Sequence, residues 1–276
     1  MANRATITPD APIIAIGIDL AWQTTHQTGI AVLQFSGGMA LLRSDPLCVQ
    51  TNDQILEVLL PFAQTETLLI GIDAPLAVPN QTGRRPAEAQ IAKSFGRFEA
   101  GAHPANRSLL ARDGKIRGET LTEAMHRDHR ISHTPILTAR APTRQSFEVY
   151  PHPAQVVLFG LEKTLKYKQR GAGRTRAERI MAFEAYRAGL RSLRDMEPAL
   201  TLHDTQLMAI DPAKLLIKSN EDQLDAIMCA YIALYYWYWG TEKCYIFGDP
   251  TDDYASGYII APVDSRTDPR TLSTSM

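Results

Sequence analysis

The chain has 276 residues, of which 45% are hydrophobic and 21% charged, and its formal net charge is −1 at pH 7. This is an ordinary globular composition, long enough for one large domain or two small ones with a sizeable core. The net charge by itself excludes no class of partner. Three widely spaced cysteines argue against a disulfide framework and a zinc motif, so we expect a reducing, cytoplasmic environment.

No basic and then apolar signal segment opens the chain, and the longest apolar run, residues 226–239, is shorter than the roughly 20 residues of a membrane-spanning helix. We therefore expect a soluble protein with no membrane partner. Charge is unevenly distributed, because residues 163–179 are strongly basic and residues 221–253 are acidic. This asymmetry permits a polyanionic partner without requiring one.

Two apolar runs that end on an aspartate dominate the first third of the chain. Residues 13–19, with the sequence IIAIGID, are typical of a strand buried on both faces, and Asp19 stands at its end. Residues 68–73 repeat the design and end on Asp73. In both runs a glycine precedes the aspartate by two residues, which often marks close approach of a backbone or a ligand. Two such strands in one sheet predict a cation site.

Between these two runs the sequence predicts two strands and a helix. Residues 30–35 and 39–43 are joined by a Ser-Gly-Gly turn and form an antiparallel meander with the first strand. Residues 53–62 carry apolar side chains on one helical face, with Asn52 or Asp53 as the N-cap. Since this helix leads into the second aspartate-ending strand, the two strands are expected to lie side by side in parallel.

The second half of the chain begins with a proline-rich, irregular stretch at about 75–144, which predicts a helical insertion that covers a site. A fifth strand at 145–150 carries Glu148, a helix is expected near 176–194, and residues 221–239 form the clearest helix, apolar nearly all round and hence buried. A short helix is expected at 154–161, another short element at 212–218, and two short edge strands at 243–247 and 257–261.

These elements predict a single α/β domain over residues 12–262. The ends of the chain, 1–11 and 263–276, are polar and are expected to be flexible tails. The aromatic run at 235–239 is expected to pack in the core or to form a contact between copies of the chain, as in a homo-oligomer.

Four aspartates form the constellation that can carry chemistry. Asp222 and Asp225 share one face at the start of the last helix, so with Asp19 and Asp73 they bring carboxylates from three elements. Oxygen ligands favour Mg²⁺ or Mn²⁺ over zinc. Two such ions roughly 3.5–4 Å apart can activate a water and stabilise the leaving oxygen of a phosphodiester. No Ser, Cys or His nucleophile is then needed.

Structural roles compete with this interpretation. Asp19 or Asp73 alone can cap a turn, and Asp222 can stabilise the start of a helix. Asp225 lies deeper in a buried helix, where it needs a metal or a basic partner. Glu148 can face the site or pair with an arginine.

Several basic residues can either bind phosphate or simply lie in a solvent-exposed loop. Arg84 and Arg85 can bind a phosphate bidentately or merely solvate a loop. A further basic set can contact a nucleic-acid backbone or form an ordinary exposed loop. Its members are Lys166, Lys168, Arg170, Arg174 and Arg176.

Five motifs resemble the DUF429 family, described as predicted nucleases of the ribonuclease H-like superfamily. They are Gly17-Ile18-Asp19-Leu20-Ala21, Ile72-Asp73-Ala74-Pro75-Leu76, Gly83-Arg84-Arg85, Glu148-Val149-Tyr150-Pro151 and Asp222-Gln223-Leu224-Asp225-Ala226. The resemblance implies a five-stranded mixed sheet, with a three-stranded antiparallel meander plus parallel strands, flanked by helices. Many relatives carry a second acid in the fourth motif; this chain has His152 there, so the role of that acid does not carry over.

The resemblance implies that Asp19, Asp73 and Asp225 are catalytic, with Glu148 and Asp222 as helpers. We therefore expect a metal-dependent nuclease that uses Mg²⁺ or Mn²⁺ to hydrolyse phosphodiester bonds in nucleic acid. Asp19 would bridge the ions and Glu148 would orient the water. Two alternatives stay open: a nucleotide-binding phosphotransferase of the actin or sugar-kinase type, and a non-catalytic nucleic-acid-binding module.

Overall fold

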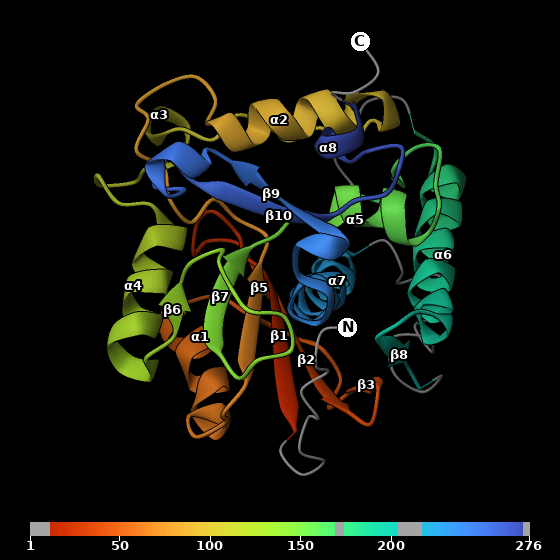
Figure 1. Ribbon diagram of the computed structural model, residues 1–276, viewed down its shortest axis with the longest axis horizontal. Coiled ribbons are helices and arrows are strands. Elements are labelled where there is room, and N and C mark those ends of the chain that lie inside the picture. The colour runs from red at the N-terminus through yellow and green to blue at the C-terminus, as the bar shows by residue number, and fades with distance from the viewer. Residues whose placement is uncertain (1–11, 169–173, 204–216, 273–276) are drawn as a thin grey trace, which may run out of the picture.

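The computed structural model describes residues 12–168, 174–203 and 217–272 (Figure 1). The larger of its two sheets contains β1 (Ile13–Asp19), β2 (Thr28–Ser36), β3 (Met39–Leu42), β4 (Leu47–Val49), β5 (Leu68–Ile72), β6 (Ser132–His133), β7 (Arg144–Glu148) and β8 (Ala199–Thr201). The strand order is β6–β7–β5–β1–β2–β3–β8, with β4 paired to β2. The chain is therefore an α/β protein with a mixed central sheet.

The five strands expected from the sequence form the middle of this sheet. β1, β2 and β3 pair antiparallel as a meander, while β5 runs parallel to β1 and β7 parallel to β5. The expected number of strands is too small, because β4, β6 and β8 add to the edges. These three strands have only two or three residues each, too few to give a sequence pattern.

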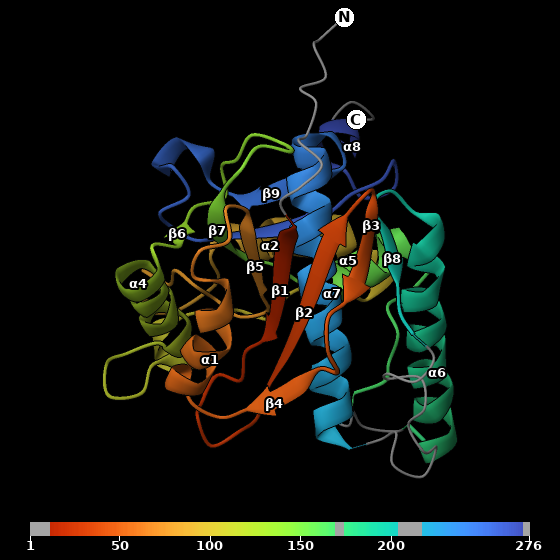
Figure 2. The same ribbon diagram turned by 90° about the horizontal axis from the view of Figure 1, so that it is seen from below.

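Helices cover both faces of the sheet (Figure 2). α7 (Lys218–Trp239) crosses one face against β1, β2 and β5. α1 (Asn52–Leu59) and α4 (Arg117–His129) cover the other face, where their apolar side chains pack on the even-numbered isoleucines of β1. Since neighbouring residues of a strand point to opposite faces, the odd-numbered residues of β1 face α7.

Two strand glycines let α7 approach the sheet unusually closely. A Cβ atom on Gly17 would lie 1.8 Å from the carbonyl oxygen of Ala226, and one on Gly71 would lie 2.2 Å from that of Cys229. Both partner atoms belong to the backbone of α7, so any side chain at these positions would push the helix away. The sequence interpretation of glycine as a mark of close approach is confirmed, with α7 as the neighbour.

The insertion between β5 and β7 contains α2 (Pro86–Phe95), α3 (Arg107–Leu110), α4 and β6. α2 packs on a second, two-stranded sheet of β9 (Cys244–Gly248) and β10 (Tyr258–Pro262). The two C-terminal strands, expected at the edge of the main sheet, therefore form a sheet of their own. One parallel bridge, from Val149 to Ile260, links it to the chain that follows β7.

The remaining helices are α5 (Pro151–Leu158), α6 (Arg176–Ser192) and α8 (Pro269–Leu272). α8 and the buried Thr267 lie in the stretch expected to be a flexible tail, so residues 263–272 carry structure. The other expected tail, 1–11, lies outside the described residues, as does most of the element expected at 212–218. Within the described ranges, no helix combines the length and apolar composition needed to cross a membrane.

Two helix starts differ from the sequence expectation. The N-cap of α1 is Thr51, whose hydroxyl accepts a hydrogen bond from the amide of Gln54, while the side-chain oxygen of Gln54 accepts one from the amide of Thr51. α7 begins at Lys218, three residues early, so Asp222 lies in its second turn rather than its first.

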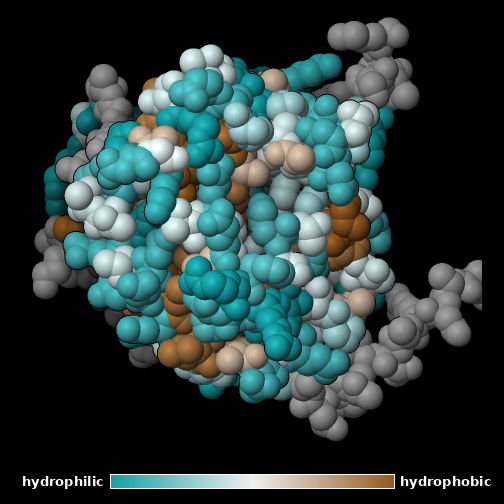
Figure 3. All heavy atoms as spheres, turned by 90° about the vertical axis from the view of Figure 1, so that its left-hand side faces the viewer, coloured by the Kyte–Doolittle hydropathy of each residue, from teal (hydrophilic) through white to brown (hydrophobic). Residues whose placement is uncertain are grey.

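The aromatic end of α7 packs in the core. Tyr235, Tyr236 and Trp237 are buried, and Tyr236 and Trp237 donate hydrogen bonds to the carbonyls of Pro135 and Ala141. The packing interpretation of this run is confirmed for these residues. On the face that carries α3 and α4, hydrophobic residues form small separate groups among hydrophilic ones (Figure 3).

Candidate functional site

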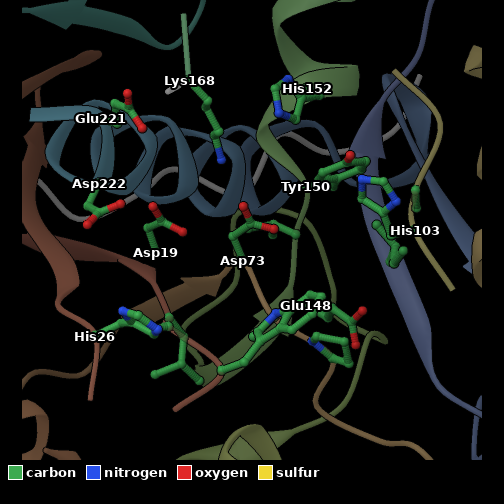
Figure 4. A pocket seen from close by; sticks show the side chains of 18 of the residues that line it. Asp19, His26, Asp73, His103, Glu148, Tyr150, His152, Lys168, Glu221 and Asp222 are labelled. Atoms are coloured by element: carbon green, nitrogen blue, oxygen red, sulfur yellow. The ribbon is translucent and has the colours of Figure 1, made fainter. Parts of the chain in front are cut away.

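Three acids that are far apart in the sequence meet at the carboxyl ends of β1 and β5. Figure 4 shows two of them, Asp19 and Asp73, side by side. Ile18 pairs with Ile72 across the two parallel strands, so Asp19 and Asp73 follow side by side. Asp225 joins them from α7, and carboxylate oxygens of the three residues lie within 4.8 Å of one another. The convergence expected from the sequence is confirmed for these three aspartates.

The strand alternation explains why the acids face the same neighbour. Gly17 and Asp19 are two residues apart and so point to one face of the sheet, toward α7, as do Gly71 and Asp73. Because the two glycines have no side chain, α7 can lie directly against the strands. Asp225 directly precedes Ala226, the residue whose backbone contacts Gly17, and therefore lies at the strand ends.

Asp19 and Asp73 form part of the lining of a cleft of about 740 Å³, which is in the range of ligand sites, while Asp225 is buried behind them. Its other walls are rich in aromatic and histidine side chains that the sequence interpretation missed. They are Trp22, His26, His103, Tyr150 and His152. Four of them follow β1 or β7 directly, so their position just after buried strands was the available signal.

Asp225 is fully buried and makes three strong contacts. Its Oδ1 accepts hydrogen bonds from the hydroxyls of Tyr167, at 2.5 Å, and Tyr186, at 2.9 Å. Its Oδ2 lies 2.8 Å from Nζ of Lys168. Burial acts to raise the pKa of Asp225, but Lys168, His152 and the hydrogen bond from Tyr167 together outweigh it, and the net shift is downward. Asp225 therefore remains ionised at neutral pH.

Asp19 and Asp73 are less well compensated. Burial raises the pKa of Asp19 to about 6, although Lys168 lowers it and Asp225 raises it further. Burial also raises the pKa of Asp73 well above its ordinary value, and the neighbouring Asp19 adds to that shift. The raised pKa values indicate that the positive charge near Asp19 and Asp73 does not balance the negative charge of the three clustered acids.

Asp222 borders the same cleft but lies outside the group of three. Its Oδ1 forms an ion pair with Lys218, one turn earlier on α7. Its Oδ2 is buried and has no hydrogen-bond partner in the part of the chain that the structure describes. The structure therefore places Asp222 beside the expected metal position rather than within it.

Glu148, expected to help catalysis, is engaged elsewhere. It pairs with Ile72 across β5 and β7, so it is level with Ile18 and points to the face opposite Asp73. Its two oxygens accept hydrogen bonds from the guanidinium of Arg85, at 2.5 and 2.9 Å, and one also from the amide of Leu76. Glu148 is thus the arginine partner that the sequence left as an alternative, not a ligand of the aspartate cluster.

Arg85 is correspondingly unavailable for phosphate binding. Its side chain is 1% exposed, and besides Glu148 it contacts Glu88 and the carbonyl oxygen of Ala77. The expectation that Arg85 binds substrate does not fit a guanidinium whose donors are all directed at protein oxygens. Arg84, the preceding residue, is exposed and does not border the cleft.

Of the remaining expected phosphate-binding residues, only Lys168 borders the cleft. Lys166 pairs with Glu99, Arg174 donates to the carbonyl of Lys166, and Arg176 is exposed at the start of α6. These three side chains are therefore not brought to the aspartates. Arg170 lies outside the described residues.

The donor set fits a hard divalent cation. Carboxylate oxygens are the ligands that Mg²⁺ and Mn²⁺ prefer, and three of them converge from three elements. Burial of Asp19 and Asp73 without enough positive charge, together with the unpaired Oδ2 of Asp222, leaves room for a further cation. Asp19, Asp73 and Asp225 are the residues that would hold it.

Comparison with known proteins agrees with the motifs identified in the sequence. No curated protein and no solved structure matches this chain. A family model described as "Protein of unknown function (DUF429)" matches residues 17–252, which include the end of β1, the insertion and the acidic part of α7. The chain therefore belongs to the DUF429 family.

Proposed function

We propose that this protein is a metal-dependent nuclease that hydrolyses phosphodiester bonds in nucleic acid, with Asp19, Asp73 and Asp225 holding Mg²⁺ or Mn²⁺. The observation that carries the proposal is the convergence of three carboxylates within 4.8 Å, two of which, Asp19 and Asp73, line a large cleft. Such a group is costly in a folded protein unless a cation compensates it.

The arrangement of the central strands supports a ribonuclease H-like core. β1, β2 and β3 form an antiparallel meander, and β5 and β7 continue the sheet in parallel, as the family resemblance implies. The acids also come from the elements that the resemblance names: the ends of β1 and β5 and the buried helix α7. The short strands β4, β6 and β8 are additions around this core.

The chemistry follows from the donor set. Bound Mg²⁺ or Mn²⁺ supplies water activation and stabilisation of the leaving oxygen, so no protein nucleophile is required. The protein orients the carboxylates: Tyr167 and Tyr186 fix Oδ1 of Asp225 and leave Oδ2 directed at the site. Glu148 acts indirectly. It accepts hydrogen bonds from the guanidinium of Arg85 and from the backbone amide of Leu76, which follows Asp73 closely in the sequence.

A substrate base has a candidate contact in Trp22, three residues beyond Asp19. Its indole is 52% exposed and borders the cleft. The guanidinium of Arg117 donates to the carbonyl oxygens of Ala21, at 2.8 Å, and Gln23, at 3.4 Å, on either side of Trp22. An exposed aromatic ring on a fixed backbone is suited to stacking on a nucleobase.

The proposal is tested by incubating the protein with labelled single-stranded, duplex and branched DNA and RNA in the presence and absence of Mn²⁺. We expect Mn²⁺-dependent cleavage of at least one substrate. Asp19→Asn should lower the rate by more than roughly 100-fold, since even outer partners of a bound metal contribute 10–100-fold.

Asp45→Asn is a matched control, because Asp45 is exposed and lies outside the cleft. It should cleave at the wild-type rate. Full activity in the Asp19→Asn variant would refute the assignment of the site. A protein that binds nucleic acid but gains no thermal stability from Mn²⁺ would instead be the non-catalytic module.

A further inference from the structure

Lys168 lies in the position that a bound cation would need. Its Nζ is 2.8 Å from Oδ2 of Asp225, the oxygen that the tyrosines leave unoccupied. In Figure 4 its side chain extends toward Asp19 and Asp73 from the opposite wall of the cleft. Among the described residues, the Lys168 ammonium is the cation that most lowers the pKa of both Asp19 and Asp73.

The neighbouring residue strengthens this placement. Tyr167 donates to Oδ1 of Asp225, so two consecutive residues contact both oxygens of one carboxylate. Tyr167 is completely buried, whereas the side chain of Lys168 is 33% exposed. Tyr167 therefore anchors the chain at Asp225, and Lys168 has open cleft into which its long, flexible side chain can move.

A divalent cation and the Lys168 ammonium cannot both occupy this place. Two positive charges a few ångströms apart repel each other strongly in a partly buried site. Asp225 would also have to give up the same oxygen to the metal. The lysine must then swing into the cleft, where the phosphate of a substrate offers it a negative charge. Glu221 and Asp222 also border the cleft but already form ion pairs with Arg179 and Lys218.

We propose that Lys168 is a tethered cation that occupies the acid cluster in the absence of divalent ions, and that ion binding transfers its ammonium from Asp225 to the substrate phosphate. This proposal rests on the proposed function and adds a regulatory property to the same site. Because a phosphate that captures Lys168 frees Asp225, phosphate and metal must each strengthen the binding of the other.

The first test is calorimetric titration of MnCl₂ into wild-type protein and into Lys168→Met, which keeps most of the side-chain length but removes the charge. We expect the variant to bind Mn²⁺ tighter by roughly 5–150-fold, the usual range of coupling between two ligands. Lys166→Met is the matched control, since Lys166 is two residues away and pairs with Glu99. It should bind Mn²⁺ as the wild type does.

The outcomes separate this proposal from the function on which it rests. Equal or weaker Mn²⁺ binding by Lys168→Met overturns the role of Lys168 but leaves the metal site in place. Absence of Mn²⁺ binding by the wild type, Lys166→Met and Lys168→Met alike overturns the proposed function itself.

A second measurement uses only the wild-type protein and so does not depend on how the variant folds. Acetylation by acetic anhydride is followed at each lysine by mass spectrometry, with and without saturating Mn²⁺. Lys168 should react several-fold faster when Mn²⁺ is bound, because its ammonium has left Asp225, while Lys166 serves as the internal reference. Unchanged or slower labelling of Lys168 would contradict the displacement.

The coupling to phosphate is tested with dimethyl phosphate, a phosphodiester anion that carries no base. In the wild type it should increase the affinity for Mn²⁺, and in Lys168→Met this increase should be lost. The same increase in both proteins would show that the phosphate binds the metal alone, and would refute the transfer of the ammonium to phosphate.

Discussion

Two groups of carboxylates lie at the same cleft, each contributing lining residues, and they are compensated very differently. In the closed cluster, Arg85 lies between Glu88 and Glu148 and directs its guanidinium donors at their oxygens and at a backbone carbonyl. In the open cluster, Asp19, Asp73 and Asp225 share one lysine.

The difference separates a structural ion cluster from a functional one. A planar guanidinium with five donors satisfies two carboxylates in fixed geometry, so the closed cluster needs nothing from outside. A single ammonium cannot do this for three carboxylates: Lys168 forms an ion pair with Asp225, and among the described residues Asp19 and Asp73 have no ion-pair partner of their own. Incomplete compensation, rather than the number of acids, marks the place for a cation.

The most severe test of this comparison removes the cation of the closed cluster. Arg85→Met should lower the free energy of unfolding by about 3–5 kcal/mol, the typical cost of leaving a buried charge without its partner. Urea denaturation at neutral pH measures this loss. Arg84→Met, at the exposed neighbouring position, should change stability by no more than about 0.5 kcal/mol. A mild effect at Arg85 would mean that the closed cluster is not structural.

The next test disturbs only the open cluster, through the helix that completes it. Gly17→Ala places a Cβ atom 1.8 Å from the backbone oxygen of Ala226, so α7 must shift. We expect a loss of about 3 kcal/mol in unfolding free energy, as for overpacking, together with weaker Mn²⁺ binding.

Gly96→Ala is the control for this substitution, because a Cβ atom there meets no atom within 4 Å. It should leave both stability and metal binding unchanged. If Gly17→Ala reduced stability but left Mn²⁺ affinity intact, the close approach of α7 would not be what positions Asp225.

A smaller effect, on substrate binding, is expected for Trp22, which is exposed and borders the cleft. Trp22→Ala should weaken binding of a short single-stranded oligonucleotide by about 1–3 kcal/mol, the usual contribution of one stacked base. Fluorescence anisotropy with Mn²⁺ replaced by Ca²⁺ measures it without turnover. Met181→Ala, which also removes an exposed apolar side chain but on α6, should bind normally. Equal affinity of the two variants would exclude Trp22 as a stacking contact.

The smallest effect concerns pH. Because burial raises the pKa of Asp19 to about 6 and also raises that of Asp73, the native state holds these protons more tightly than the unfolded chain does. The resulting stability is present below the unfolded pKa near 4 and is lost as pH rises through about 6. Asp225, whose pKa is lowered, changes charge below this window.

Mg²⁺ binds the ionised acids, so the rise in melting temperature that it causes should be larger at pH 8 than at pH 5. Differential scanning calorimetry at both pH values, with and without Mg²⁺, measures this. In Asp19→Asn the dependence on pH should be reduced, and an Mg²⁺ effect that is the same at both values would contradict the raised pKa of the cluster.

The sequence was sufficient for the part of the site that depends on strand ends. Gly-Ile-Asp at the end of each apolar run correctly placed Asp19 beside Asp73, because parallel strands bring their carboxyl ends to one edge. The burial of the last helix predicted that Asp225 needs a metal or a basic partner, and the structure supplies the basic one, Lys168.

The sequence could not place Glu148, because its role depends on strand register. A shift of one residue between β5 and β7 would turn it to the face of Asp73. Nothing in an isolated apolar strand fixes that register. For the same reason the partner of Arg85, which is 63 residues distant along the chain, could not be identified from local pattern.

The glycine contacts between sheet and helix have a consequence for how freely the rest of the interior can vary. Where main-chain atoms of two elements touch, their separation is fixed by the polypeptide itself and not by the volume of any side chain. Isoleucines and leucines elsewhere in the interior can therefore be exchanged for residues of other shapes while the gap between β1 and α7 stays constant at Gly17. The distance between Asp225 and the two aspartates at the strand ends therefore depends on the backbone contact between α7 and the strands, and not on how the surrounding side chains pack.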